Sequence, residues 1–178
     1  MQNLIQIRGT NGSGKTYIVY KLMPKFDFHP VRNGKGKTIG HLDKKYKFFL
    51  VGEYRVATGG ADTIKSQDEL GRIIRKALAK GYNVLFEGII ASQLAERYAK
   101  LYHEATENGV NVTYIFLNVP LDTCKANINS RRAKIGKPPT EAKYVEKTYT
   151  ATLQSRKNLK NKYGVQERHA STQSKRSI

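Results

Sequence analysis

The sequence predicts an α/β fold, a parallel sheet with helices packed on both of its faces. Short apolar runs at 4–7, 82–86 and 110–119 have the length and composition of buried strands. Between and after them lie longer segments whose apolar residues recur at helical spacing. Strands that alternate with helices are joined by crossover connections, and these connections produce parallel sheets.

The first third of the chain combines strand, helix and loop patterns. Glycine and proline in the loop segments, and Pro24 after the first helix, favour chain reversals and helix ends. Asp43 and the lysines after it favour a turn between two strand-like runs. The predicted elements are a strand at 4–7, a helix at 15–23, a flexible loop at 26–37, a β-hairpin with arms at 38–42 and 46–54, and a loop at 55–63.

The rest of the chain alternates helices with strands. The pattern is clearest at 66–81, where Ser66 and Glu69 form a capping box and Gly81 ends the helix. The predicted elements are helices at 66–81, 92–107, 121–132 and 140–163, strands at 82–86 and 110–119, and a basic loop at 133–139.

Length and composition indicate one domain. The chain has 178 residues, of which 39% are hydrophobic, enough for one core. We place that domain at 1–164 and treat 165–178 as a polar tail, a candidate for disorder. The apolar runs are far shorter than a membrane span, and the amino terminus lacks a secretory signal pattern. We therefore expect no membrane association and a location in the cytoplasm, that of the host if the chain is phage-encoded.

Cysteine and histidine give no metal or disulfide site. Cys124 is the single cysteine, so no internal disulfide can form. The four histidines are scattered without ligand spacing, and we assign no metal to them.

The net charge indicates a phosphate-bearing partner. The chain has 32 Lys and Arg against 14 Asp and Glu, a formal charge of +18. Residues 1–124 have 18 basic and 11 acidic side chains, whereas residues 125–178 have 14 and 3. Such a field attracts nucleic acids, but it suits small phosphates or solubility equally well. The charge alone does not select the partner.

A glycine-rich motif between the first strand and the first helix indicates nucleotide binding. It matches G-x-x-x-x-G-K-[ST] at every fixed position. The glycines let backbone N–H groups point at phosphate oxygens, and the helix that follows adds its positive end. The lysine suits the β- and γ-phosphates, and the threonine hydroxyl suits Mg²⁺. The motif consists of Gly9, Thr10, Asn11, Gly12, Ser13, Gly14, Lys15 and Thr16.

At this motif the chain resembles the P-loop NTPase superfamily, and its small size resembles the branch of nucleoside, nucleotide and polynucleotide kinases. The resemblance implies a parallel sheet of about five strands, ATP with Mg²⁺, and an arginine-bearing lid. Glu87, which follows the strand at 82–86, is then the candidate metal or acceptor ligand. The simpler interpretation of Glu87 is a charge at a strand end.

The lid is expected at about 129–139. Arg131 and Arg132 lie there, and guanidinium groups suit a migrating phosphoryl group. Because adjacent helical residues point about 100° apart, we expect only one of them to reach the nucleotide. A solvated basic helix end is the alternative interpretation.

A kinase also needs a group that receives the proton of the acceptor hydroxyl. Asp62 is the favoured candidate because it ends a glycine-rich segment that allows close approach to a ligand, although a local turn explains it equally well. Asp27 and Glu87 remain alternatives. Asp43 fits a turn better.

Three short segments resemble phage kinases that phosphorylate 5-hydroxymethyluracil within DNA. These are Gly52-Glu53-Tyr54, Thr58-Gly59-Gly60-Ala61-Asp62-Thr63-Ile64 and Phe86-Glu87-Gly88. The likeness spans about 1–132 and implies that ATP phosphorylates a base hydroxymethyl group. A base held in a duplex would have to be flipped outward to reach the phosphates.

A basic and aromatic segment at 25–47 is a candidate DNA contact. Its cations are suited to track a backbone and its aromatic rings to stack on a base, whereas the alternative is a solvated basic surface with the rings in the core. The segment contains Arg32, Lys35, Lys37, Lys44, Lys45, Tyr46 and Lys47, and Phe48 and Phe49 follow it directly.

The leading hypothesis is an ATP- and Mg²⁺-dependent kinase that acts on a DNA hydroxyl, most specifically that of 5-hydroxymethyluracil. The alternatives are a kinase of free nucleosides, nucleotides or polynucleotide 5′-hydroxyls, and a nucleotide-gated module that binds nucleic acid without catalysis. Steep salt dependence would separate the DNA enzyme from a nucleoside kinase, and a product assay would separate both from the module.

Overall fold

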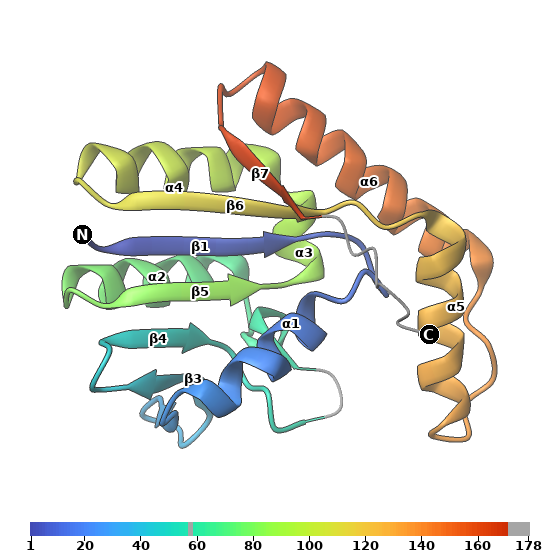
Figure 1. Ribbon diagram of the computed structural model, residues 1–178, viewed down its shortest axis with the longest axis horizontal. Helices are drawn as coiled ribbons and strands as arrows, with labels where there is room; N and C mark the ends of the chain where they lie inside the picture. The colour runs from blue at the N-terminus through green and yellow to red at the C-terminus, as the bar shows by residue number, and fades with distance from the viewer. Residues whose placement is uncertain (57–58, 171–178) are drawn as a thin grey trace, which may run out of the picture.

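In the computed structural model, which describes residues 1–56 and 59–170, the strands form one seven-stranded sheet (Figure 1). The order across the sheet is β2-β3-β4-β5-β1-β6-β7. The strands are β1 (Asn3–Arg8), β2 (His29–Arg32), β3 (Thr38–Asp43), β4 (Phe48–Val51), β5 (Asn83–Glu87), β6 (Asn111–Leu117) and β7 (Glu167–Ala170).

Helices connect the strands and pack against the sheet. The α-helices are α1 (Lys15–Leu22), α2 (Gln67–Ala79), α3 (Ile89–Gln93), α4 (Ala95–Glu107), α5 (Leu121–Ala133) and α6 (Ala142–Asn161). Two 3₁₀ turns, η1 (Met23–Lys25) and η2 (Ala61–Thr63), complete the described elements. No helix in the described segments is long and apolar enough to cross a membrane.

Five neighbouring strands, from β4 through β5, β1 and β6 to β7, run parallel. This confirms the predicted parallel sheet. β3 is antiparallel to both β4 and β2, which confirms the predicted hairpin. The second arm of the hairpin, β4, also pairs in parallel with β5 and so belongs to the parallel part of the sheet.

The strands alternate their side chains between two apolar layers. In β5, Val84 and Phe86 lie in a core shared with α2 and α4, whereas Leu85 lies in a second core that includes Val19 of α1. Helices therefore cover both faces, as the alternation of elements predicts.

Three segments differ from the sequence predictions. The predicted loop at 26–37 contains β2, an edge strand in which Pro30 is tolerated. The predicted helix at 92–107 is two helices, α3 and α4, because Leu94 leaves the helical conformation. β7 lies within the expected tail at 165–178, and residues 171–178 lie outside the described part of the chain.

β7 extends the fold beyond the boundary predicted at residue 164. It pairs in parallel with β6, from Tyr114↔Glu167 to Leu117↔Ala170. The polar sequence of this segment contains no alternation of apolar residues, so the pairing is carried by its backbone and is invisible to pattern reasoning.

The strand register defines two edges of the sheet. β1 and β5 end together, with Ile7 opposite Glu87, at the edge where the glycine-rich loop begins. Asp43, Phe48 and Asn83 are in register at the other edge, which therefore holds the β3–β4 turn. We call these the catalytic edge and the far edge.

Candidate active site

The glycine-rich loop joins β1 to α1 at the catalytic edge. Gly12 has a φ of 74° and Gly14 has a φ of 93°, in the region that favours glycine. A Cβ at Gly12 would lie 2.3 Å from the carbonyl oxygen of Cys124 in α5. The second glycine of the motif therefore permits close helix packing as well as the curl of the loop.

Lys15 lies inside this loop. Its Nζ donates hydrogen bonds to the carbonyl oxygens of Gly9, at 2.8 Å, and Thr10, at 2.9 Å. Burial lowers the pKa of Lys15, and the charges of Glu87 and Asp62 oppose that shift. The ammonium group is thus held by weak neutral acceptors that a phosphate can replace.

Three helices brace the loop. The Ser92 hydroxyl of α3 accepts a hydrogen bond from the Gly9 N–H at 3.2 Å. Asn127 of α5 donates its side-chain amide to the Gly12 carbonyl at 2.8 Å. Thr148 of α6 contacts the Thr10 hydroxyl at 3.4 Å. The loop is therefore fixed from several sides, and preorganised N–H groups need little rearrangement when an anion binds.

Glu87 lies at the end of β5, beside the loop. Its side chain is buried, with only 2% of the residue exposed, and its Oε1 accepts a hydrogen bond from Thr16 Oγ1 at 3.0 Å. Burial raises the pKa of Glu87 to about 7, against the opposing effects of the Lys15 charge and the Thr16 hydrogen bond. A buried carboxylate is costly, so the site gains from a cation.

Thr16 and Glu87 fit a magnesium ion. They place a hydroxyl and a carboxylate oxygen in contact, and Mg²⁺ prefers such hard oxygen donors. In the described residues no three His, Cys, Asp or Glu side chains gather as a metal site. This agrees with Mg²⁺ chemistry, in which one or two protein ligands are combined with waters and substrate phosphates.

Asp62 lies on η2, opposite the start of α3. Its Oδ2 accepts the N–H of Ile89 at 2.6 Å and its Oδ1 accepts that of Ile90 at 3.3 Å. The Asp62 side chain is exposed, and its charge contributes to the pKa shifts of both Lys15 and Glu87. The fold therefore brings together Lys15, Thr16, Glu87 and Asp62.

Gly60 allows the segment that carries Asp62 to lie close to Glu87. Its φ is 95°, and a Cβ there would lie 2.3 Å from Glu87 Oε1. Of the glycine pair that the sequence indicates as a close-approach site, Gly60 thus lies against the Glu87 carboxylate.

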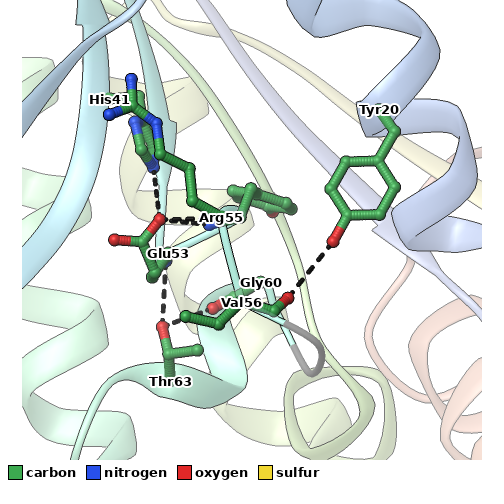
Figure 2. A network of polar contacts seen from close by, with 8 residues as sticks. Tyr20, His41, Glu53, Arg55, Val56, Gly60 and Thr63 are labelled. Carbon is green, nitrogen blue, oxygen red and sulfur yellow. Dashed lines mark hydrogen bonds and ion pairs between the residues drawn. The ribbon is translucent and has the colours of Figure 1, made fainter. Parts of the chain in front are cut away.

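A polar network fixes the loop that carries Asp62 (Figure 2). The Glu53 carboxylate accepts the N–H groups of Tyr54 and Arg55, at 2.9 and 2.8 Å, and lies 3.3 Å from His41 Nε2. Thr63 Oγ1 accepts the Glu53 N–H at 3.0 Å and donates to the Gly60 carbonyl at 2.7 Å. Glu53 therefore joins β3, through His41, to both ends of the loop at 52–63, which we call the acceptor loop.

The pKa values of the two titratable groups of this network, His41 and Glu53, are both lowered. Burial lowers the pKa of His41, against the attraction of Glu53. Burial would raise the pKa of Glu53, but hydrogen bonds from Arg55 N–H and the Thr38 hydroxyl outweigh it, so that pKa is lowered. A neutral imidazole thus faces an ionised carboxylate.

Sequence reasoning gives no role to His41 or to the phenol of Tyr54. Tyr54 is 3% exposed, and its hydroxyl has no hydrogen-bond partner among the described residues. Burial, followed by the charges of Glu87 and Asp62, raises its pKa well above the usual value. Position in the sequence was the signal that could have found Tyr54, because Glu53 and Tyr54 come soon after β4, which ends at the catalytic edge.

The two lid arginines have different surroundings. Arg131, at the exposed side of α5, is close enough to Lys15 that its charge lowers the Lys15 pKa. Arg132 donates from Nε to the Pro138 carbonyl at 2.5 Å, and Asn129 accepts the Thr140 N–H at 3.0 Å. The Arg131 charge therefore acts on Lys15, whereas Arg132 holds the loop that follows α5.

Two alternative acidic candidates lie away from the site. Asp43 accepts the Tyr46 and Asp27 N–H groups, at 2.9 and 2.8 Å, in the turn at the far edge, which agrees with the expected turn role. Asp27 is held there too, with its side chain 87% exposed and 3.0 Å from His29 Nε2. Its distance from the catalytic edge argues against Asp27 as the proton acceptor.

The aromatic residues of the hairpin are not a base-stacking platform. Phe48 and Phe49 are buried in the two cores, because their strand is internal to the sheet. Tyr46 is exposed, but it packs edge-on against Phe26 at the far edge. The interpretation of these rings as core residues is thus correct for Phe48 and Phe49. Thr58, part of the motif resembling phage kinases, lies outside the described residues.

The fold and this cluster define a P-loop kinase: a parallel sheet whose glycine-rich loop places Lys15 and Thr16 beside a strand-end carboxylate. Residues 1–163 match the family model described as 5-hmdU DNA kinase. The chain belongs to the 5-hmdU DNA kinase family.

Individual relatives agree with the family match. The chain is 32% identical to the 5-hmdU DNA kinase of Pseudomonas phage PaMx11, over 89% of this chain and 85% of that protein. It is 26% identical to the 5-hmdU DNA kinase of Bacillus phage SP10, over 72% of this chain but only 21% of that protein. Among solved structures, deoxyadenosine kinase from M. mycoides with bound dATP matches with a TM-score of 0.42 and 16% identity, over 96% of this chain and 91% of that one.

Proposed function

We propose that this protein transfers the γ-phosphoryl group of ATP, with Mg²⁺, to the hydroxymethyl group of 5-hydroxymethyluracil bases in DNA. Support comes from membership of the 5-hmdU DNA kinase family and from the relatives of that name. The observation that carries the proposal is the meeting of Lys15, Thr16, Glu87 and Asp62 at one edge of the sheet. Nucleotide-binding groups and a candidate acceptor group are thereby adjacent.

The phosphate loop and the lid bind the nucleotide. Backbone N–H groups of the loop and the start of α1 surround the phosphates. Lys15 exchanges its two carbonyl contacts for β- and γ-phosphate oxygens, and Arg131 binds the migrating group from the lid side. Thr16 and Glu87 would hold Mg²⁺, which would neutralise charge on the phosphates.

Asp62 serves the acceptor side. The acceptor oxygen forms a bond to the γ-phosphorus while the bond from that phosphorus to the β,γ-bridging oxygen breaks and ADP leaves. The acceptor proton passes to the Asp62 carboxylate and from there to water. The Ile89 and Ile90 N–H groups hold this carboxylate in place while its exposed side faces solvent. A base from a duplex must leave the stack to reach it, whereas a single strand presents it directly.

Transfer of label from γ-labelled ATP tests the proposal. Three acceptors are compared: DNA containing 5-hydroxymethyluracil, the same DNA containing thymine with a free 5′-hydroxyl, and free 5-hydroxymethyl-2′-deoxyuridine. Label confined to the first acceptor, with a product mass one phosphate larger at the modified base, is the expected result. Label on the second acceptor would indicate a polynucleotide 5′-kinase, label on the third alone a nucleoside kinase, and DNA binding without product a non-catalytic module.

Lys15→Ala provides the control for this assay. Removal of the ammonium group should abolish transfer to every acceptor because the β- and γ-phosphates lose their only cation inside the loop among the described residues. Residual activity equal to that of the wild type would show that a contaminating kinase produces the signal.

A further inference from the structure

Apart from Lys25, the cations of the basic segment at 25–47 are divided by the sheet into two groups of three. Arg32, Lys35 and Lys37 lie on or beside the β2–β3 turn, which we call the near turn. Lys44, Lys45 and Lys47 lie on the β3–β4 turn, which we call the far turn. All six side chains are exposed. The groups are matched in charge and differ in where the fold places them.

The strand register shows which edge each turn occupies. Arg32 pairs with Thr38, and Gly40 pairs with Val51 at the end of β4, so the near turn is at the edge where β5 ends in Glu87. The far turn is in register with Asn83 at the start of β5. A β-strand advances about 3.3 Å per residue, so the length of β5 and its neighbours separates the two turns.

The near turn is also fixed to the acceptor loop. Lys37 Nζ donates a hydrogen bond to the Thr63 carbonyl at 2.6 Å, one residue after Asp62. Within the turn, Asn33 Oδ1 accepts the N–H groups of Lys35 and Lys37, each at 3.0 Å, and Arg32 donates to the Gly36 carbonyl at 2.9 Å. These contacts join Lys37 to the residue that follows Asp62 and fix Arg32 and Lys35 on the same turn.

The positive charge of the near turn is not neutralised by carboxylates within the described residues. None of its three cations is in an ion pair there. The nearby carboxylates of Asp62 and Glu53 are engaged by backbone N–H groups. The near turn therefore offers exposed cations to an outside anion.

We propose that the near turn binds the DNA phosphates next to the acceptor nucleotide, and that the far turn takes no part. This inference rests on the proposed function. Phosphate contacts position a nucleic acid without reading its sequence, and a base presented to Asp62 carries its flanking phosphates to the same edge. The near turn would thus set how DNA, but not a free nucleoside, is positioned.

A pair of double variants tests the inference. Lys35→Gln with Lys37→Gln removes two charges from the near turn, and Lys44→Gln with Lys45→Gln removes two from the far turn. Binding of a fluorescent 5-hydroxymethyluracil duplex is measured by anisotropy over a range of salt concentrations. Each lost phosphate contact lowers the slope of log K against log salt by about 0.9. We expect a drop of about 2 for the near-turn variant and none for the far-turn variant.

The single variant Lys35→Gln guards against loss of the Lys37–Thr63 contact. The Lys35 ammonium makes no hydrogen bond or ion pair recorded within the described residues, so its removal leaves the acceptor loop intact; we expect a slope change of about 1. Equal slopes for wild type and near-turn variants, or equal losses at both turns, would overturn the inference. The anisotropy experiment measures DNA binding without turnover. A failed phosphorylation assay would therefore refute the proposed function, but the comparison of the salt slopes would still be valid.

Discussion

At the scale of single residues, Glu87 stands out because the fold buries a carboxylate that is unfavourable when ionised. The folded protein holds its proton more tightly than the unfolded chain, since the pKa is about 7 instead of the usual 4.5. As pH rises between these values, the unfolded chain releases the proton first, so the free energy of unfolding falls. Ionised Glu87 therefore lowers the free energy of unfolding at neutral pH, and its carboxylate is a candidate ligand for a cation.

Glu87→Gln should therefore stabilise the nucleotide-free and metal-free protein at neutral and higher pH. The variant should gain up to about 3 kcal/mol over wild type between about pH 5 and about pH 8, because it removes the ionisation cost. Urea unfolding in the presence of a chelator at both pH values measures this gain. A difference between the two proteins that does not change with pH would contradict the burial argument. Activity should fall at every pH.

Asp62 accepts N–H groups at the start of α3 and is the proposed proton acceptor, and one substitution can separate these two roles. Asn keeps a carbonyl oxygen for the Ile89 N–H but loses the negative charge. We expect Asp62→Asn to lower kcat by about 10²- to 10⁴-fold and to leave the KM for ATP near the wild-type value. Asp62→Ala should add a loss of about 1 kcal/mol in stability, because the start of α3 loses its acceptor. Unchanged kcat in Asp62→Asn would reduce Asp62 to a helix-capping residue.

At the scale of elements, we expect the two neighbouring arginines of the proposed lid to have different roles. Arg131 acts on Lys15 electrostatically, whereas Arg132 is bonded to the Pro138 carbonyl. Removing a preorganised donor costs about 10²- to 10³-fold in kcat, and we expect that loss for Arg131→Ala. Arg132→Ala should change kcat less and expose the loop at 134–139 to limited proteolysis. Lys134→Ala is the control for lost charge, and equal kcat losses in all three variants would contradict the division.

The loop at 52–63 and α3 form a second unit that depends on backbone proximity. Gly52 as well as Gly60 is closely approached, since a Cβ at Gly52 would lie 2.2 Å from the Gly60 carbonyl oxygen. The antiparallel bridge between Glu53 and Gly60 closes the loop. Main-chain contacts therefore help to set the position of Asp62, together with the Glu53 and Thr63 side chains.

At the scale of the whole molecule, the net charge of +18 is distributed by the fold, and only part of it faces the catalytic edge. If DNA is the acceptor, released counterions make its binding salt-dependent. We expect the KM for DNA to rise steeply between about 50 and 200 mM salt. The KM for ATP should change far less, and it serves as the internal reference. A KM for DNA that does not respond to salt would argue for a small-molecule acceptor.

Local sequence determined the nucleotide side of this protein. The phosphate loop, the capping box at Ser66 and the helical spacing that follows it are short-range signals, and each is present in the structure as expected. Glu87 is predictable for the same reason, because a strand-end carboxylate after an apolar run needs only its own neighbours for recognition.

The sequence favoured Asp62 on the candidate acceptor side, but only the tertiary structure shows what surrounds it. Strand register places Asp27 and the far turn at the far edge, away from the candidate site. The fold places Asp62 at the start of α3. His41 and Tyr54 gained their surroundings, and β7 its strand, only through partners distant in the chain. The residues of the phosphate loop are contiguous in sequence, whereas those of the candidate acceptor site come from several strands and loops. Strand register is a long-range property that local patterns do not encode.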